Sequence, residues 1–268
     1  TIPLAKGFAP DKLNFPVFVS EKLDGVPVRW DIRLRRTSSD AYVIEVYAST
    51  RSGEHAVSTM LDAREFANLI VPLLTHNINY TFVWEVTHVA YTSFKDISGV
   101  VRRQAPQKGL VYNLFDFTEH DGSTADFSSR MASAKDFLSE VVAAGKGNRY
   151  KLIPQYEIKN LDTLNTLSLE DRFATPYQEG WVVRSHDAPF KPGCRHWDYQ
   201  KIVREPTSDL RIIRYEEGAG KNAGGVGRLI AEYNGKEIGV GPGKMSYAQR
   251  QEEWKKYKDG VHSSPRIA

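Results

Sequence analysis

Several features that define other classes of protein are missing from this chain of 268 residues. It has a single cysteine, Cys194, which excludes an intrachain disulfide framework and a cysteine-rich zinc site. No apolar run approaches the length of a membrane span, and the sequence opens without a signal-peptide pattern. We therefore expect an intracellular, cytoplasmic protein in a reducing compartment, with no membrane partner.

A large excess of charge of one sign is also missing. Lys and Arg number 36 against 33 Asp and Glu, so the formal net charge is +3 and the isoelectric point is near 8.8. Such a mild excess is compatible with a polyanionic partner but does not indicate one by itself. With 41% apolar and 26% charged residues, the chain is long enough to bury a core in one large domain or two ordinary ones.

The apolar pattern changes near residue 205. Before it, strand-like runs alternate with occasional amphipathic helices and no repeat occurs, which is typical of an α+β domain. After it come a strand, a glycine-rich basic loop, a hairpin turning at Asn234-Gly235 and a charged helix capped by Ser246. This succession favours a small β-barrel of the OB-fold type. We predict domains at 1–205 and 206–268, and we expect the second to be incomplete at its C-terminal end, where another strand begins.

Within the first domain, we expect one helix over Thr59–Leu74, with Ser58 as its N-cap and an early end or bend at Pro72. Runs at Val26–Leu34 and Leu110–Phe117 predict strands.

One lysine stands where an apolar, strand-like run ends. The segment is Glu21-Lys22-Leu23-Asp24-Gly25, directly after Phe15 to Val19. Burial disfavours the charged form of a lysine and makes its amine a better nucleophile. Asp24 can steady that amine, and Gly25 lets the backbone turn close to a ligand. Taken alone, the motif is more typical of a surface hairpin with an Asp-Gly turn.

Further segments change that interpretation. A carboxylate, Glu85, interrupts an apolar strand, Phe115 lies in a buried aromatic run, Glu179 precedes an apolar strand, and Lys201 ends an aromatic stretch. Each has an ordinary alternative: Phe115 as core, Glu179 as a solvated strand-end carboxylate, Lys201 as a surface lysine. The histidines are not spaced as metal ligands.

In order and spacing, these segments resemble the nucleotidyltransferase motifs of ATP-dependent DNA ligases, especially the small bacteriophage type of the covalent nucleotidyltransferase superfamily. The segments that carry the resemblance are 17–29 with K-x-D-G, 50–53 with the serine-arginine turn, 82–86, 98–102, 111–117, 179–184 with E-G-x-V-x-R, and 195–204. The resemblance covers most of the chain. It implies a nucleotidyltransferase (ATP-grasp-like adenylation) domain followed by an OB-fold domain.

The resemblance also assigns roles. Lys22 would carry AMP covalently, and Lys201 would assist catalysis by neutralising phosphate charge. Glu85 and Glu179 would hold or orient hydrated Mg²⁺, with Mn²⁺ as an alternative. The residues expected to bind the ATP cofactor are Glu21, Asp24, Gly25, Arg29, Arg51, Glu85, Phe115, Glu179, Arg184 and Lys201.

The implied activity is sealing of 5′-phosphate/3′-hydroxyl nicks in duplex DNA through a lysyl-AMP and a DNA-adenylate. The partner would be nicked DNA, clamped by a monomer through salt-sensitive phosphate contacts. Three alternatives stay open: an RNA ligase, a capping-type nucleotidyltransferase, and a catalytically silent nucleic-acid-binding protein.

The chain departs from the family pattern at several motif positions. Pro27 stands where an arginine is usual, and Arg29 is the nearest replacement. The family usually has a carboxylate two residues before the lysine, but this chain has Ser20 there. The nearest carboxylate, Glu21, is adjacent to Lys22, so on a strand its side chain points to the opposite face from that of Lys22. Arg184 replaces a lysine and keeps the charge. The register around Lys201 is open, and the R-x-D-K-type motif near the C-terminus is not found.

Overall fold

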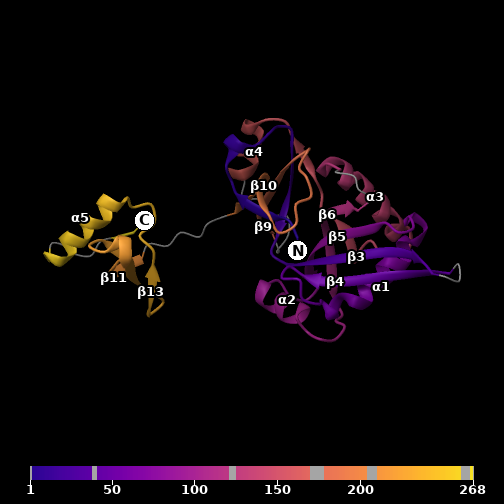
Figure 1. Cartoon of the computed structure of the whole chain (residues 1–268), viewed down its shortest axis with the longest axis horizontal. Helices are drawn as coiled ribbons and strands as arrows, with labels where there is room; N and C mark the ends of the chain where they lie inside the picture. Colours follow the sequence, from indigo (N-terminus) through magenta and orange to yellow (C-terminus); the bar gives the residue numbers. More distant parts are fainter. Residues whose placement is uncertain are drawn as a thin grey trace. The chain divides into compact units, whose positions relative to one another are not determined.

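The computed structural model describes residues 2–37, 41–120, 125–169, 178–203, 210–260 and 266–267. The chain divides into two compact units, Thr1–Arg204 and Glu205–Ala268 (Figure 1). Each unit combines helices with largely antiparallel sheets, so the α+β class predicted from the apolar pattern is confirmed.

The first sheet of unit 1 has five strands. In spatial order they are β4 (Tyr42–Thr50), β3 (Val26–Arg36), β5 (Asn79–His88), β6 (Leu110–Glu119) and β7 (Tyr150–Leu152). All neighbours are antiparallel except β6 and β7. Alternate residues of β3, such as Trp30, face a core closed by helices α1 (Met60–Ile70), α2 (Phe94–Val101) and α3 (Phe127–Ala143). The other face of the sheet is therefore left for the site.

The second sheet also has five strands. In order they are β1 (Leu4–Gly7), β10 (Arg195–Val203), β9 (Gln178–Ser185), β2 (Val17–Leu23) and β8 (Tyr156–Ile158). A smaller core, which includes Val19, Val183 and Leu164 of α4 (Leu161–Leu169), supports it. Strand β2 ends at Leu23 and β3 begins at Val26, so Asp24-Gly25 carries the chain from one sheet to the other. The lysine motif thus lies at the junction of the two sheets.

The helix prediction at 59–74 is partly wrong at its ends. Helix α1 begins at Met60 and has Thr59, without a side-chain cap bond, at its N-cap position. Ser58 instead lies in a short 3-10 turn (Val57–Thr59), where its hydroxyl donates to the Val101 carbonyl at 2.6 Å. The α-helix ends at Ile70, and a 3-10 turn (Val71–Leu73) follows with Pro72 near its start. The early end of the helix near Pro72 is confirmed. The prediction of Ser58 as the N-cap is wrong, because its hydroxyl bonds to Val101 instead.

Unit 2 is a small antiparallel sheet with one helix. The strands, in order, are β13 (Lys236–Val240), β12 (Val226–Tyr233), β11 (Leu210–Glu217) and β14 (Arg266–Ile267). Asn234 and Gly235 both have positive φ (49° and 73°), which confirms the predicted hairpin turn. Ser246 forms a capping box at the start of α5 (Tyr247–Lys258), also as predicted. The strand expected to begin near the chain end is β14, paired with β11.

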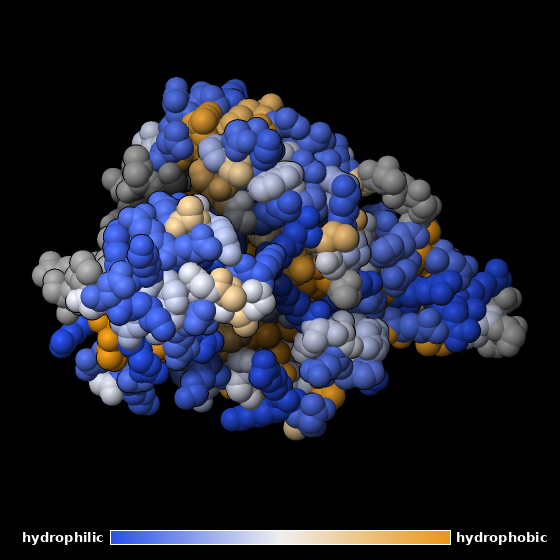
Figure 2. All heavy atoms as spheres, turned by 60° about the vertical axis from the view of Figure 1, so that its left-hand side comes forward, coloured by the Kyte–Doolittle hydropathy of each residue, from blue (hydrophilic) through white to orange (hydrophobic). Residues whose placement is uncertain are grey.

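Two further 3-10 turns (Pro10–Lys12 and Gly220–Asn222) complete the described elements. Hydrophilic residues dominate the face drawn in Figure 2, and hydrophobic ones form scattered patches there. Among the described helices, none combines the length and apolar character needed to cross a membrane.

Candidate active site at the junction of the two sheets

The predicted lysine lies in a cavity with most of its expected partners. Lys22 is near the end of β2, where it pairs with Gly180 of β9, and Val182 of β9 pairs in turn with Lys201 of β10. The predicted residues that line one cavity are Lys22, Asp24, Gly25, Arg51, Glu85, Phe115 and Lys201. Segments far apart in the sequence therefore meet around one amine.

Two β-bulges shape this cavity. On β6, Asp116 pairs with Val83 and Leu114 with Trp84, so Phe115 has no partner opposite it. This extra residue lets Leu114 and Phe117 both face the core while Phe115 lines the cavity. Bulges re-aim side chains in this way beside active sites. Phe115 is thus absent from the hydrophobic core, contrary to the ordinary alternative for a phenylalanine in a buried strand.

The second bulge carries Glu179. Lys22 pairs with Gly180 and Leu23 with Gln178, which leaves Glu179 unmatched on β9. Its carboxylate accepts a hydrogen bond from the Lys22 amine and forms an ion pair with it. The carboxylate can therefore orient the amine of Lys22, with both side chains still partly exposed.

Glu85 approaches the same lysine from the first sheet. The Gly25 amide donates to its carboxylate, and a Cβ added at Gly25 would lie 2.5 Å from the Val86 carbonyl oxygen and 3.0 Å from Glu85 Cγ. The Asp-Gly turn is therefore a close backbone approach that leaves no room for a side chain. The neighbours that require this glycine are Val86 and Glu85, while the expected approach of Gly25 to a ligand stays a prediction.

Burial sets the charge state of the Lys22–Glu85 pair. Removal from water lowers the pKa of the Lys22 amine; Glu85 and Asp24 oppose this, while Lys201 and Arg51 add to it. Burial raises the pKa of Glu85 to about 8, against the opposing pull of Lys22. The Lys22 amine consequently loses its proton at a lower pH than that of an ordinary lysine, and the neutral amine is the form that acts as a nucleophile.

Substitutions at the two charged neighbours should move the titration of Lys22 in opposite directions. Glu85→Gln removes a charge that raises the pKa of Lys22, so half-maximal reactivity should fall to a lower pH. Lys201→Gln removes a charge that lowers it, so half-maximal reactivity should occur at a higher pH. The measurement is the pH dependence of acylation of Lys22, followed by peptide mass spectrometry. Glu54→Gln, at an exposed site, is the control; shifts of the same sign in both test variants would contradict this electrostatic account.

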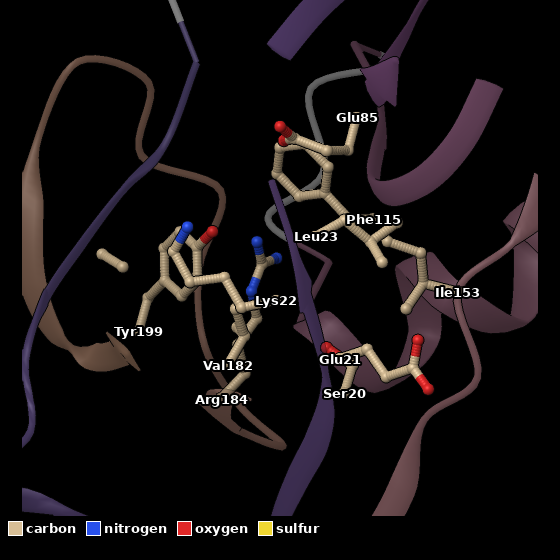
Figure 3. Close-up of a pocket in the computed structure, with 11 residues that line it drawn as sticks. Ser20, Glu21, Lys22, Leu23, Glu85, Phe115, Ile153, Val182, Arg184 and Tyr199 are labelled. Atoms are coloured by element: carbon tan, nitrogen blue, oxygen red, sulfur yellow. The ribbon is translucent and has the colours of Figure 1, made fainter. Parts of the chain in front are cut away.

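Arg184 lines a second, adjoining cavity that shares Lys22, Glu85 and Phe115 with the first, and its side chain is held in a buried charge cluster. Its Nη1 donates to Asp116 Oδ2 at 2.5 Å, and Arg130 lies 3.2 Å from the other oxygen of Asp116. The rings of Tyr199 and Phe127 pack on the Arg184 guanidinium, with centroids at 3.9 and 4.6 Å. Arg184 therefore forms a rigid wall of the cavity, beside Phe115 (Figure 3).

The structure does not bring Arg29 into the cavity. Its guanidinium makes a bidentate contact with Asp31, at 2.7 to 3.0 Å, on the same face of β3. Glu21 lies on the other side of β2 from Tyr199, next to Ile153 (Figure 3). Because side chains alternate between the two faces of a strand, Glu21 was predicted to point away from the face of Lys22. Arg29 thus lines none of the cavities around Lys22, whereas Glu21 lines the cavity that also contains Lys22, Phe115 and Arg184.

Sequence reasoning missed several lining residues. Arg195 adds a cation and Phe94 an aromatic ring, and residues 2–5 bring the N-terminal segment to the cavity. Tyr199 lines both this cavity and the adjoining one, and Ile153 lines the adjoining one. Some of these positions are fixed by strand pairing, such as Leu4 against Arg195, and Phe94 by the start of helix α2; no local motif marks them. An aromatic stretch at 197–199 was the one usable signal.

Carboxylates near Lys22 are the groups available to a divalent cation. Within the described ranges no cluster of three or more His, Cys, Asp or Glu side chains is placed to hold a metal. Glu85 and Glu179 approach Lys22 from the two sheets. Two carboxylates suit a Mg²⁺ ion that keeps most of its waters and takes further ligands from phosphate.

Gly180 is required by the contact between β9 and β10. A Cβ there would lie 2.1 Å from the Ile202 carbonyl oxygen. Gly180→Ala should push the strands apart, lower the free energy of unfolding by about 1–3 kcal/mol and displace Lys201. Gly99→Ala, in helix α2 with nothing within 4 Å, should instead raise stability by roughly 0.5–1 kcal/mol. Chemical denaturation checks both; equal effects would contradict the close approach.

The structure matches DNA ligases over nearly its whole length. A structure titled Pmar-Lig_PreS3 is 19% identical with a TM-score of 0.72, over 99% of this chain and 61% of that one. The Chlorella virus DNA ligase-adenylate is 16% identical (TM-score 0.54; 99% and 89% covered). The ATP-dependent DNA ligase of bacteriophage T7, in complex with ATP, is 16% identical (TM-score 0.57; 98% and 89% covered).

The chain thus has the fold of minimal ATP-dependent DNA ligases, with an adenylation-type domain and a small OB-type sheet. It spans about 61% of the length of the first of these matches. No protein-family model matches the sequence, and the comparison with curated proteins gave no significant match.

Proposed function

We propose that this protein is an ATP-dependent DNA ligase that joins 5′-phosphate and 3′-hydroxyl ends at nicks in duplex DNA. One observation carries the proposal: a lysine whose pKa is lowered by burial lies among cations and beside the half-buried ring of Phe115, within the fold of DNA ligases. A lowered lysine pKa in a cleft lined by phosphate-binding residue types supports a nucleophile rather than a structural ion pair.

The first step would place AMP on Lys22. The neutral Nζ attacks the α-phosphorus of ATP; an N–P bond forms, the bond to the β-phosphate oxygen breaks, and pyrophosphate leaves. Arg51, Arg195 and Lys201 line the cavity beside Lys22 and would neutralise the phosphates. Phe115 would stack on the base.

Glu179 and Glu85 would serve the amine and a metal. Both interact with Lys22, so each can take part in removing its proton or in holding it in position. The same carboxylates would hold hydrated Mg²⁺, which would shield charge on the phosphates when bound.

The second and third steps would use DNA. An oxygen of the 5′-phosphate attacks the phosphorus of the lysyl-AMP, which breaks the N–P bond and returns Lys22. The 3′-hydroxyl then attacks the 5′-phosphorus, a phosphodiester bond forms, and AMP leaves. The DNA ligase folds that this chain resembles support DNA as the nicked substrate.

A sealing assay separates this proposal from its alternatives. Nicked duplexes of DNA and of RNA, each with a 5′-phosphate, are incubated with ATP or GTP and Mg²⁺. We expect sealing of the DNA duplex with ATP. Sealing of RNA alone would identify an RNA ligase, and covalent label from GTP alone would indicate a capping-type enzyme. Failure on every duplex, including pre-adenylated nicked DNA, would leave a nucleic-acid-binding protein.

A further inference from the structure

Three cavities follow one another along the junction of the two sheets. The cavity around Lys22 that includes Arg51, Arg195 and Lys201 is called here the phosphate cavity. The one that includes Phe115 and Arg184 but none of those three cations is the base cavity. A third, the outer cavity, shares Glu21, Leu23 and Ile153 with the base cavity and only Leu23 with the phosphate cavity.

This sharing gives the cavities an order. The base cavity lies between the other two, so a nucleotide with its phosphates among the cations and its base on Phe115 points its base toward the outer cavity. The outer cavity contains neither Lys22 nor Phe115. It therefore lies beyond the base, outside the space needed for the chemistry.

The floor of the outer cavity is a continuation of the same sheet face. Thr87 pairs with Val111, and Asn113 pairs with both Glu85 and Lys151, so these side chains extend the face that carries Glu85. The volume is about 500 Å³, within the range of small-molecule sites. The Asn113 amide already donates to the Glu85 carbonyl and to Thr87, so the floor is preformed.

Glu21 fixes which edge of the base faces this cavity. It lines both cavities, and within the described residues no hydrogen bond or ion pair engages its carboxylate. Removal from water by burial raises the pKa of the Glu21 carboxyl, and no neighbouring group contributes to that shift. A carboxylate accepts hydrogen bonds. The exocyclic amine is the donor that an adenine base offers, so that amine belongs next to Glu21.

We propose that the outer cavity is a subsite for groups attached to the exocyclic amine of adenine, so that the protein uses N⁶-substituted ATP as an adenylate donor. This inference rests on the proposed function. The transfer is the same as for ATP: the N–P bond to Lys22 forms and pyrophosphate leaves, while the added group enters the space over Thr87, Val111 and Asn113.

The test compares ATP with N⁶-benzyl-ATP by intact-protein mass spectrometry. In the unsubstituted protein we expect the benzylated nucleotide to label with kcat/KM within about tenfold of ATP. Val111→Trp fills the outer cavity from a residue that lines neither other cavity, and should cut labelling by N⁶-benzyl-ATP at least about a hundredfold while ATP changes less than about threefold. Val43→Trp, the same change at an exposed site on β4, should leave both unchanged.

A second readout does not depend on reaction. Calorimetric binding to Lys22→Ala should give the two nucleotides similar affinities, and adding Val111→Trp should weaken only the benzylated one. Strong ATP labelling with rejection of N⁶-benzyl-ATP by about a thousandfold would overturn the subsite alone, as would an equal loss of both nucleotides in Val111→Trp. If ATP neither labels the protein nor binds Lys22→Ala, the proposed function fails, and the subsite fails with it.

Discussion

Replacing Lys22 by alanine is expected to abolish ATP-dependent sealing, with a loss of at least about 10⁴-fold, because the attacking amine is gone. The other lysine among the residues lining this cavity, Lys201, cannot take its place without moving a strand, because it pairs with Val182 on the far side of β9 from β2. The measurement is the rate of sealing of a nicked DNA duplex with ATP and Mg²⁺.

The same variant should still seal nicked DNA that already carries the 5′-adenylate, within about tenfold of the unsubstituted protein. Lys22 is not required to form a bond in that last step, so the retained activity also shows that the variant is folded. Equal loss on both substrates would contradict the assignment of Lys22 as the nucleophile of the first step.

Replacing Asp116 by alanine should produce the largest loss of stability, about 3–5 kcal/mol in the free energy of unfolding of unit 1. Asp116 is 1% exposed and holds both Arg130 and Arg184, which are 2% and 3% exposed. Without the carboxylate, two buried guanidinium groups lose their counter-ion. Chemical denaturation followed by the fluorescence of the buried Trp30 and Trp84 measures the loss.

Two variants test whether charge is the cause. Asp116→Asn keeps the shape and one acceptor but removes the charge, so we expect an intermediate loss. Asp136→Ala, at an exposed site on α3, should change stability by less than about 0.5 kcal/mol. If Asp116→Asn unfolded like the unsubstituted protein, the charge cluster would not be the stabilising element.

The repeating patterns of the chain predicted its strands well. Apolar alternation in β3 has a period of two and a clear buried face, and Asn234-Gly235 fixes its hairpin by backbone conformation alone. The lysine motif could be found because an amine at the end of an apolar strand is unusual. Each of these features depends on residues that are neighbours in the sequence, so it can be predicted without knowing the fold.

The rest depends on contacts between distant segments. A bulge adds one unpaired residue, and nothing in the run Leu114-Phe115-Asp116-Phe117 shows which residue it is. The burial of Asp116 depends on Arg184, 68 positions later. Ser58 has the composition of an N-cap but bonds to Val101 instead. The ion pair of Arg29 with Asp31 is easier to predict from the sequence, because Asp31 lies two residues further along and therefore on the same face of the strand.

The most direct test of the account is to identify the residue that carries AMP. The protein is incubated with ATP and Mg²⁺ without DNA, digested at alkaline pH, where an N–P bond survives, and its peptides are sequenced by mass spectrometry. We predict AMP on the Lys22 side chain, and its disappearance when nicked 5′-phosphorylated DNA is added afterwards. AMP on Lys201 or another residue, or no adduct under conditions where ATP binds, would contradict the account.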